Sequence, residues 1–270
     1  MNTIQVKQLF THPVKGLTPE ALDHADLRVG YGLSGDRAFA LLYDSSDPET
    51  ADPITPWIDK NNLAMQRERP ELAALACHYE PNTGVLTVKR NHAELLAADT
   101  NTPGGRTQIS HFFSDYLANV PSGQSGRYAN RNQLRFIGTR NNNTRYADRE
   151  HIHLSIVSEA TLDHLSEVAG QWIDVRRFRP NIVVEGVSAW EEFTWVGQEF
   201  ELGTARIRIT ERLTRCPNID VHPDTGDFDI KLFELIQKTF KHKDTGVVAT
   251  VIQDGTIAVG DNITANARCT

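Results

Sequence analysis

The stretch ARIRIT, residues 205–210, alternates apolar and polar side chains at every position. A period of two residues is typical of a β-strand that buries one face and exposes the other. Other alternating or β-branched runs occupy residues 5–10, 38–43, 84–88, 181–184, 247–252 and 256–259, between Gly, Asn and Pro residues. Glycine in NTG (82–84) and in DG (254–255) favours tight turns, which we expect to close hairpins.

Three segments favour helices instead, at residues 108–119, 158–168 and 228–240. Their apolar side chains recur mainly every three or four residues, which is the period of a helix with one buried face. Seven or more strands with few helices favour a barrel or a sandwich over a doubly wound sheet. The sequence also contains no G-x-G-x-x-G or P-loop motif. The predicted fold class is therefore mainly β with a few helices (α+β).

The composition is that of a globular protein. The 270 residues are 39% hydrophobic and 23% charged, which is enough for one large domain or two smaller ones. A net charge of −7 lacks the positive field on which nucleic-acid binding relies. No apolar run approaches the roughly 18–20 residues that span a bilayer, and the first residues contain no signal-peptide core. We therefore expect a cytoplasmic protein with neither a nucleic-acid nor a membrane partner.

Two stretches have the composition of loops, at residues 44–59 and 138–150. The first contains three prolines, and the second contains three successive asparagines, both typical of irregular structure. The second stretch is the predicted boundary between two domains, residues 1–137 and residues 138–270.

The three cysteines are Cys77, Cys216 and Cys269. An odd number at wide spacing excludes a disulfide framework and any four-cysteine zinc or iron–sulfur site within the chain. Sulfur chemistry would therefore involve single thiols. We expect Cys77 to be structural and Cys269 to be incidental.

Cys216 stands in the segment TRCPNIDVHPDTG (214–226), close after the predicted strand at 205–210. Arg212 and Arg215 flank it, and nearby cations favour the thiolate, the form that binds soft metals. The alternative is a small core residue, because a free cysteine is among the most buried residue types. The arginines and the proline-containing turn favour a functional site.

A second segment, RRFRPNIVV (176–184), places three guanidinium groups directly before a predicted strand. Arg179 and Asn181 offer donors suited to an oxyanion, although a solvated run of charges is an equal alternative. Ser158 precedes a predicted helix and is expected to cap it. The free amides of a helix N-terminus also suit a phosphate, so both roles can coexist.

Two further segments lie near the N-terminus, HPVKG (12–16) and GDR (35–37). Lys15 and Arg37 would project from neighbouring strand ends, with ordinary surface charge as the alternative reading. His151 and His153 share one face of an extended segment, but no third ligand lies nearby in the sequence. A core or surface role therefore fits these histidines better than zinc binding.

Taken in order, these segments resemble the signature of the MOSC family, named after the C-terminal domain of molybdenum-cofactor sulfurases. The matching segments are HPVKG (12–16), GDR (35–37), SEA (158–160), FRPNIVV (178–184), RC (215–216), DTG (224–226) and VGD (259–261). The resemblance is to the two-domain branch, which includes the mitochondrial amidoxime-reducing components and the bacterial reductases of N-hydroxylated bases. It implies an N-terminal β-barrel-like domain followed by a MOSC β-barrel domain.

The resemblance also implies a cofactor and the residues that hold it. Cys216 would ligate the molybdenum of a pterin cofactor and act as the catalytic residue, and no iron–sulfur cluster is expected in this chain. The implied cofactor-binding residues are Lys15, Gly16, Arg37, Ser158, Arg179, Asn181, Thr214 and Arg215.

By the same resemblance, the protein would be an oxidoreductase that reduces N-hydroxylated or related N–O and S–O compounds. A separate donor of ferredoxin, flavodoxin or cytochrome type would supply the electrons. Ser188 stands where the amidoxime-reducing components have an aspartate, so no substrate-side proton donor is implied. Two alternatives stay open: a carrier of persulfide or of the molybdenum cofactor, and a protein that binds pyridoxal phosphate through Lys15.

Overall fold

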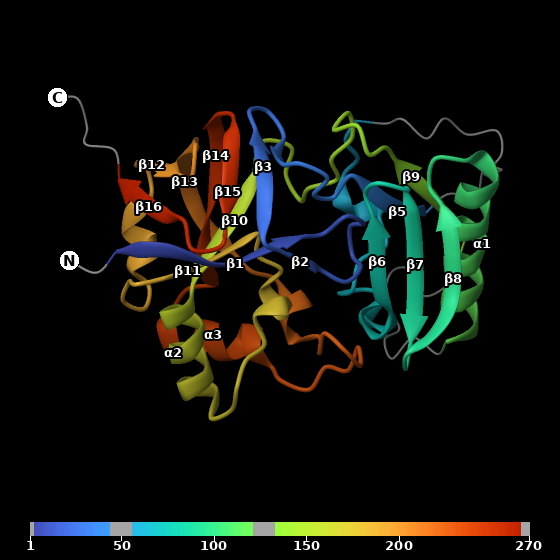
Figure 1. Ribbon diagram of the computed structural model, residues 1–270. Helices are drawn as coiled ribbons and strands as arrows, with labels where there is room; N and C mark the ends of the chain where they lie inside the picture. The colour runs from blue at the N-terminus through green and yellow to red at the C-terminus, as the bar shows by residue number, and fades with distance from the viewer. Residues whose placement is uncertain (1–2, 44–55, 121–132, 266–270) are drawn as a thin grey trace.

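A closed barrel of seven strands contains most of the second half of the chain together with the first strand (Figure 1). The computed structural model describes residues 3–43, 56–120 and 133–265. Neighbouring strands around the barrel follow the order β11-β10-β14-β13-β12-β16-β1, and β1 closes it by pairing with β11. Their bounds are β1 Ile4–Thr11, β10 Leu154–Ser158, β11 Ile182–Glu185, β12 Glu199–Leu202, β13 Ala205–Thr214, β14 Asp244–Gln253 and β16 Asn262–Ala265.

The alternation that predicted the strand at 205–210 has its expected physical consequence in β13. Ala205, Ile207 and Ile209 are buried, whereas Arg208 is exposed. The buried side chains join a core that fills the barrel and includes Val6 from β1. All the strands predicted from the sequence are present, and the mainly β fold class is confirmed.

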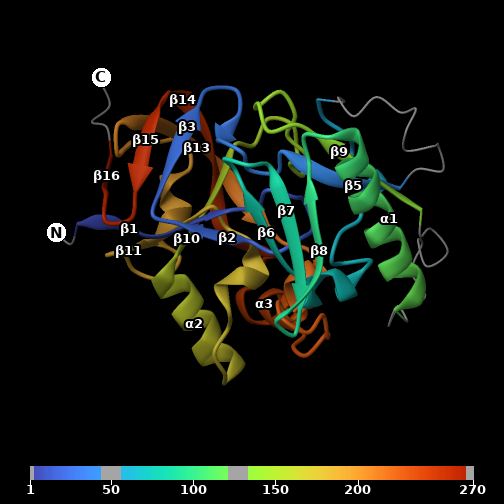
Figure 2. The same ribbon diagram turned by 45° about the vertical axis from the view of Figure 1, so that its right-hand side comes forward.

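A second group of strands and a long helix form the other side of the molecule (Figure 1; Figure 2). These strands form a two-stranded sheet, β5-β9, and a three-stranded sheet, β6-β7-β8, which pack with α1 around a separate core. A third small sheet, β15-β3-β4, lies beside the barrel. The bounds are β2 Glu20–Leu22, β3 His24–Arg28, β4 Gly32–Leu33, β5 Phe39–Tyr43, β6 Ala76–Glu80, β7 Val85–Arg90, β8 Ala93–Asp99, β9 Leu134–Gly138 and β15 Gly255–Ala258.

Most of residues 3–33 pack with the second half of the chain, whereas Val14 and Leu17 belong to the other core. β1 pairs with β11, β16 and β2, and Val6, Leu9, Leu27 and Leu33 belong to the barrel core. The polypeptide therefore starts in the barrel, contacts the other core through Val14 and Leu17, returns to the barrel side in β2–β4, and crosses again after β4 until near residue 139. The domain division at residue 138 stays a prediction.

The three helices are α1 Pro103–Asn119, α2 Glu159–Ala169 and α3 Leu232–Phe240. α1 starts five residues earlier than predicted, because Thr102 caps it and Pro103 fits the first turn. α3 starts four residues later than predicted. Phe228 instead pairs with Val221, and the Asp220 carboxylate accepts the hydrogen bond from the Phe233 amide.

One of the two predicted hairpins is confirmed. Gly84 adopts a φ of 78° between the paired strands β6 and β7. The hairpin predicted at residues 254–255 is wrong, because β15 pairs with β3 rather than with the preceding β14. Gly255 instead allows a close backbone approach, since a Cβ there would lie 2.4 Å from the Ala205 nitrogen.

Short 3-10 helices complete the structure and help to shape the loops of the site. They are η1 Lys60–Asn62, η2 Pro70–Ala74, η3 Val175–Phe178, η4 Glu191–Trp195 and η5 Pro217–Asp220. Among the described residues, no helix combines the length and apolar character needed to cross a bilayer. Residues 44–55 of the predicted loop at 44–59, and Cys269, lie outside the described residues.

Candidate functional site

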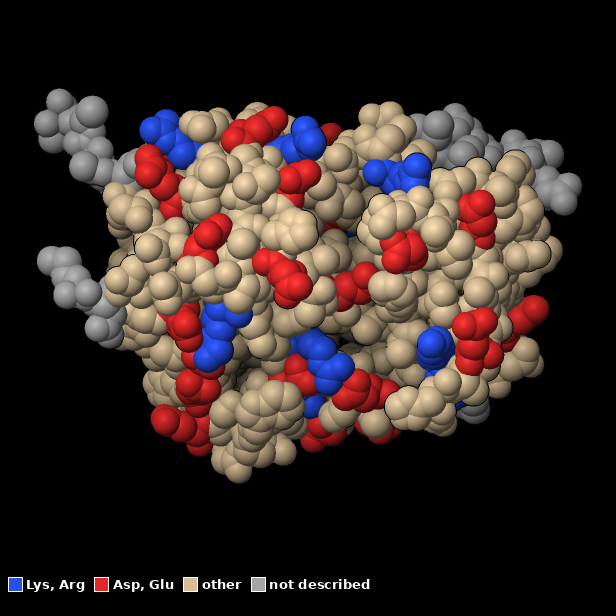
Figure 3. All heavy atoms as spheres, viewed as in Figure 1, with Lys and Arg blue, Asp and Glu red and all other residues tan. Residues whose placement is uncertain are grey.

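A cavity of about 220 Å³ lies between the barrel and the second group of strands. In the part of the chain that the structure describes, its lining contains nine cationic side chains but only two carboxylates, whereas the net charge of the whole chain is −7. On the face shown in Figure 3, Lys and Arg are interspersed with Asp and Glu. The positive charge is therefore concentrated in the cavity, which suits a small anion.

Cys216 lines this cavity at the point where β13 ends and η5 begins. Its side chain is neither fully buried nor fully exposed, and Pro217 follows it at the first position of η5. Cys77 contrasts with it, because Cys77 lies in the core beside α1 and burial raises the pKa of its thiol to about 12. The prediction that Cys77 is structural is confirmed.

Arg215, next to Cys216, is fixed by three hydrogen bonds to backbone carbonyls. Its Nε and Nη2 donate to the Thr245 oxygen at 2.9 and 2.6 Å, and its Nη1 donates to the Phe178 oxygen at 2.7 Å. Burial lowers the pKa of this guanidinium to about 9. Arg212, also predicted beside the thiol, lies instead over the Phe193 ring and does not line the cavity.

Arg179 reaches from the second half of the chain to the first. It ends η3 with a left-handed φ of 50°, and its Nη1 donates a 2.7 Å hydrogen bond to the Leu17 carbonyl. Burial, followed by repulsion from Arg37, lowers the pKa of Arg179 to about 9. An anion between Arg179 and Arg37 would relieve this repulsion.

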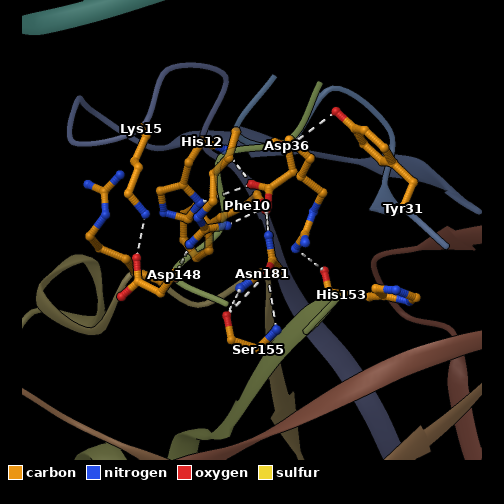
Figure 4. A network of polar contacts seen from close by, with 12 residues as sticks. Phe10, His12, Lys15, Tyr31, Asp36, Asp148, His153, Ser155 and Asn181 are labelled. Atoms are coloured by element: carbon orange, nitrogen blue, oxygen red, sulfur yellow. Dashed lines mark hydrogen bonds and ion pairs between the residues drawn. The ribbon is translucent and has the colours of Figure 1, made fainter. Parts of the chain in front are cut away.

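The carboxylate of Asp36, labelled in Figure 4, fixes Arg37, which lines the cavity. Asp36 is fully buried; its Oδ1 accepts the hydrogen bond from the His12 amide at 2.9 Å, and its Oδ2 pairs with the Arg37 guanidinium. Burial opposes ionisation of Asp36, but Arg37 and His12 outweigh burial and hold its pKa below the usual range. Asp36 therefore remains charged and orients Arg37.

Lys15 is paired with a carboxylate that the sequence did not identify. Its side chain is only 5% exposed, and its Nζ bonds to Asp148, as Figure 4 shows. Lys60 lies 3.6 Å from the other oxygen of Asp148. Asp148 itself is 60% exposed, so it lies where an incoming anion would compete for both lysines.

Asn181 lines the cavity, but its amide has structural partners. The Oδ1 accepts hydrogen bonds from the Ser155 nitrogen and hydroxyl at 3.1 and 3.2 Å, and the Nδ2 donates to the Phe10 carbonyl at 3.3 Å. Asn181 thus ties β11 to β10 and β1 beneath the cavity. Its predicted contact with a cofactor stays a prediction.

Ser158 is the one predicted site residue that does not line the cavity. It is fully buried and caps α2, where its hydroxyl accepts from the Thr161 amide and donates to Glu192 at 3.0 Å. The predicted capping role is confirmed. The Glu192 carboxylate lies beside this helix N-terminus, and the predicted contact of Ser158 with a cofactor stays a prediction.

Gly16 and Thr214, the remaining predicted residues, both line the cavity. Gly16 has a φ of 82°, and a Cβ there would lie 2.6 Å from the Ala64 carbonyl oxygen, so the glycine permits a close backbone approach. The Thr214 hydroxyl donates to Asp244 at 2.7 Å. The cavity thus combines Lys15, Gly16, Arg37, Arg179, Asn181, Thr214, Arg215 and Cys216.

Two regions of the sequence match known protein families, and together they include both sides of this cavity. The MOSC domain profile matches residues 143–264, and the MOSC N-terminal beta barrel domain profile matches residues 3–120. The chain belongs to the MOSC family. Fold and family are therefore as the segments from HPVKG (12–16) to VGD (259–261) implied.

Three curated relatives show the extent of this similarity. Mitochondrial amidoxime reducing component 2 of Rattus norvegicus is 32% identical over 242 residues, 84% of this chain and 69% of the relative. Component 1 of Mus musculus is 24% identical over 236 residues, 84% of this chain and 68% of the relative. The match to component 2 of Bos taurus, 33% identical, covers 40% of this chain and 35% of the relative. In that match the chain spans about a third of the curated protein.

The donor set of this MOSC cavity fits an anionic cofactor that needs one soft metal ligand. Cys216 supplies the thiol, and cationic side chains from both halves of the chain surround it. The Nε atoms of Arg145 and Arg177, both lining residues, are buried without an acceptor in the described part of the chain. Unpaired buried donors of this kind favour an anionic ligand in the cavity.

Proposed function

We propose that this MOSC protein is a molybdenum-cofactor-dependent reductase of N-hydroxylated or related N–O and S–O compounds. The observation that carries the proposal is that Cys216 shares one cavity with cations contributed by both halves of the chain. The names of the amidoxime-reducing relatives support the reaction class. When bound, the molybdenum–pterin group supplies the two-electron redox chemistry.

The residues of the chain divide into two roles in this proposal. Cys216 ligates the metal, because a thiolate is a soft ligand suited to a centre that already carries sulfur ligands. Lys15, Arg37, Arg179 and Arg215 balance the negative charge of the pterin phosphate and the metal ligands. The hydrogen bonds of Arg179 and Arg215 to backbone carbonyls mean that these two side chains need little reorganisation when the anion binds.

Electrons come from a separate donor protein of ferredoxin, flavodoxin or cytochrome type. The sequence has three cysteines, fewer than the four that hold an iron–sulfur cluster. We place the reaction in the cytoplasm, as the sequence led us to expect.

The proposal is tested by the reduction of an N-hydroxylated amidine with an artificial one-electron donor. Protein from a host that makes the molybdenum cofactor is compared with Cys216→Ser and with Cys77→Ser, which removes a thiol outside the cavity. We expect Cys216→Ser to lose activity and Cys77→Ser to retain it, provided it folds with normal circular dichroism. A metal-free preparation that still reduces the substrate would overturn the proposal.

Mass spectrometry of the native protein separates the two alternatives. One added sulfur atom on Cys216, without molybdenum, would identify a persulfide carrier, and bound cofactor without turnover would identify a cofactor carrier. A Schiff base on Lys15 would identify a pyridoxal phosphate protein. The amine must be unprotonated to react; the ion pair with Asp148 favours the protonated amine, whereas burial outweighs it and lowers the pKa of Lys15.

A further inference from the structure

Among the described residues that line the cavity, the only carboxylates are Glu68 and Asp148. The cations around them serve charge balance, whereas a carboxylic acid can also deliver a proton. Two acids in one site take opposite roles when their surroundings move their pKa values apart. Their environments therefore decide which acid retains a proton.

Asp148 is the acid that stays ionised. Lys15 bonds to one of its oxygens, and Lys60 lies 3.6 Å from the other. The attraction of Lys15 holds the pKa of Asp148 below its usual range. A carboxylate held by two ammonium groups does not donate protons near neutral pH.

Glu68 has the opposite environment. Its side chain is only 20% exposed, and its Oε2 is buried without a hydrogen-bond partner in the part of the chain that the structure describes. The nearest cation is the Arg67 Nε, 3.6 Å from the other oxygen. That distance is too long for a strong charge-assisted hydrogen bond.

The charges that face Glu68 do not compensate for its burial. Burial raises the pKa of Glu68, Arg67 and Lys60 lower it, and Asp148 raises it further, leaving a pKa above the ordinary value. The buried hydroxyl of Tyr43 is also close enough to interact electrostatically. The protonated acid is therefore more populated in Glu68 than in an exposed glutamate.

We propose that Glu68 is the proton donor of the cavity and protonates the oxygen that leaves the substrate. The role rests on the proposed function and supplies a residue that the sequence could not assign. Reduction of an N–OH group breaks the N–O bond and consumes two electrons and two protons, giving an N–H group and water. The separate donor protein supplies the electrons. Glu68 supplies one proton and recovers it from solvent through its exposed edge, and the second comes from water.

The other acids near the site are less suited to this step. Lys15 and Arg37 are already paired with Asp148 and Asp36. His12 is fully buried and does not line the cavity. Burial also lowers its pKa to about 3, so it carries no exchangeable extra proton near neutral pH.

The test compares Glu68→Gln, which keeps size and polarity, with Glu94→Gln, a matched change on the exposed face of β8. Both variants should retain wild-type molybdenum and pterin content. We expect Glu68→Gln to reduce substrate about 100-fold more slowly and Glu94→Gln to match the wild type. The wild-type rate should decline as pH rises through the pKa of Glu68, and this decline should disappear in Glu68→Gln.

A second measurement does not depend on activity. In metal-free Cys216→Ser protein labelled with carbon-13 glutamate, the carboxyl of Glu68 should titrate above the ordinary value of about 4.3. Burial also raises the pKa of Glu20 and Glu192, so the Glu68 signal is identified as the raised one that is missing in the double variant with Glu68→Gln. Full metal content with an unchanged rate and pH profile in Glu68→Gln, or a Glu68 that titrates at the ordinary value, would overturn the role. A wild-type protein without molybdenum would instead overturn the proposed function.

Discussion

The Nη1 of Arg179 donates a 2.7 Å hydrogen bond to the backbone carbonyl of Leu17, 162 residues earlier in the chain. This bond joins the end of η3 to the segment that carries Lys15 and Gly16. Arg37 adds a second link, from its Nη2 to the Arg179 carbonyl at 3.4 Å. Because these bonds cross the cavity wall, the two halves of the chain hold each other's cations in place.

Replacement of Arg179 should therefore reduce both stability and cofactor retention. Arg179→Met removes a partly buried donor from the Leu17 carbonyl, and we expect a loss of about 1–3 kcal/mol in the free energy of unfolding. Arg208→Met, which removes an exposed partner of Glu199, should change it by no more than about 1 kcal/mol. Urea unfolding of metal-free proteins measures both values. Equal effects of the two substitutions would contradict the linking role of Arg179.

Ser158 should matter for stability and not for the cofactor. Ser158→Ala removes the cap of α2 and a donor to the buried Glu192, so we expect a loss of about 1–3 kcal/mol. Its molybdenum content, measured on folded protein, should equal that of the wild type, because Ser158 does not line the cavity. A folded Ser158→Ala protein without metal would show that the serine contacts the cofactor.

Thiol alkylation should separate the two described cysteines. In metal-free protein, Cys216 should react with iodoacetamide because it lines an open cavity. Cys77 should stay unmodified until unfolding, because it is buried and its pKa is raised to about 12. Peptide mapping identifies the modified residue. In protein that contains the cofactor, Cys216 should be protected from alkylation. Equal labelling of Cys216 with and without the cofactor would argue against metal ligation.

Acid should destabilise the fold through His12. Burial lowers the pKa of His12 to about 3, whereas an unfolded histidine titrates near about 6.5. Between these values the unfolded chain binds the extra proton, so stability falls as pH falls. From pH 7 to pH 5 the expected loss is about 2 kcal/mol. His153, whose pKa burial also lowers, to about 4, acts in the same direction.

Unfolding in urea at pH 7 and at pH 5 measures this effect. His12→Asn should reduce the difference between the two pH values, even if it lowers stability at both. His78→Asn serves as the control, because the His78 side chain is 64% exposed. An unchanged difference in His12→Asn would mean that His12 titrates normally in the folded protein.

Local patterns predicted the strands well because the barrel buries alternate side chains. The period in ARIRIT (205–210) corresponds directly to the buried and exposed faces of β13. Segment order also identified Cys216 and the cations around it. Closeness in the sequence wrongly placed Arg212 beside the Cys216 thiol. Alternate residues of a strand point to opposite faces, and Arg212 lies over the Phe193 ring.

Asp148 and Glu68 could not be found from local patterns. Both lie in loops without periodicity, and Asp148 meets Lys15 across 133 residues of sequence. The pairing of β15 with β3 was also missed, because it joins segments that are far apart in the sequence. The local turn pattern at DG (254–255) carries no information about such a partner. Contacts of this kind depend on how the two halves of the chain pack.

Metal and pterin content of freshly purified protein tests the central claim most directly, namely that the cavity binds a molybdenum cofactor through Cys216. The protein is produced in a host that makes this cofactor, alongside Cys216→Ser and Cys77→Ser. We predict one molybdenum atom and one pterin per chain in the wild type and in folded Cys77→Ser, and no molybdenum in folded Cys216→Ser. Wild-type protein without molybdenum, or Cys216→Ser with the full amount, would contradict the claim.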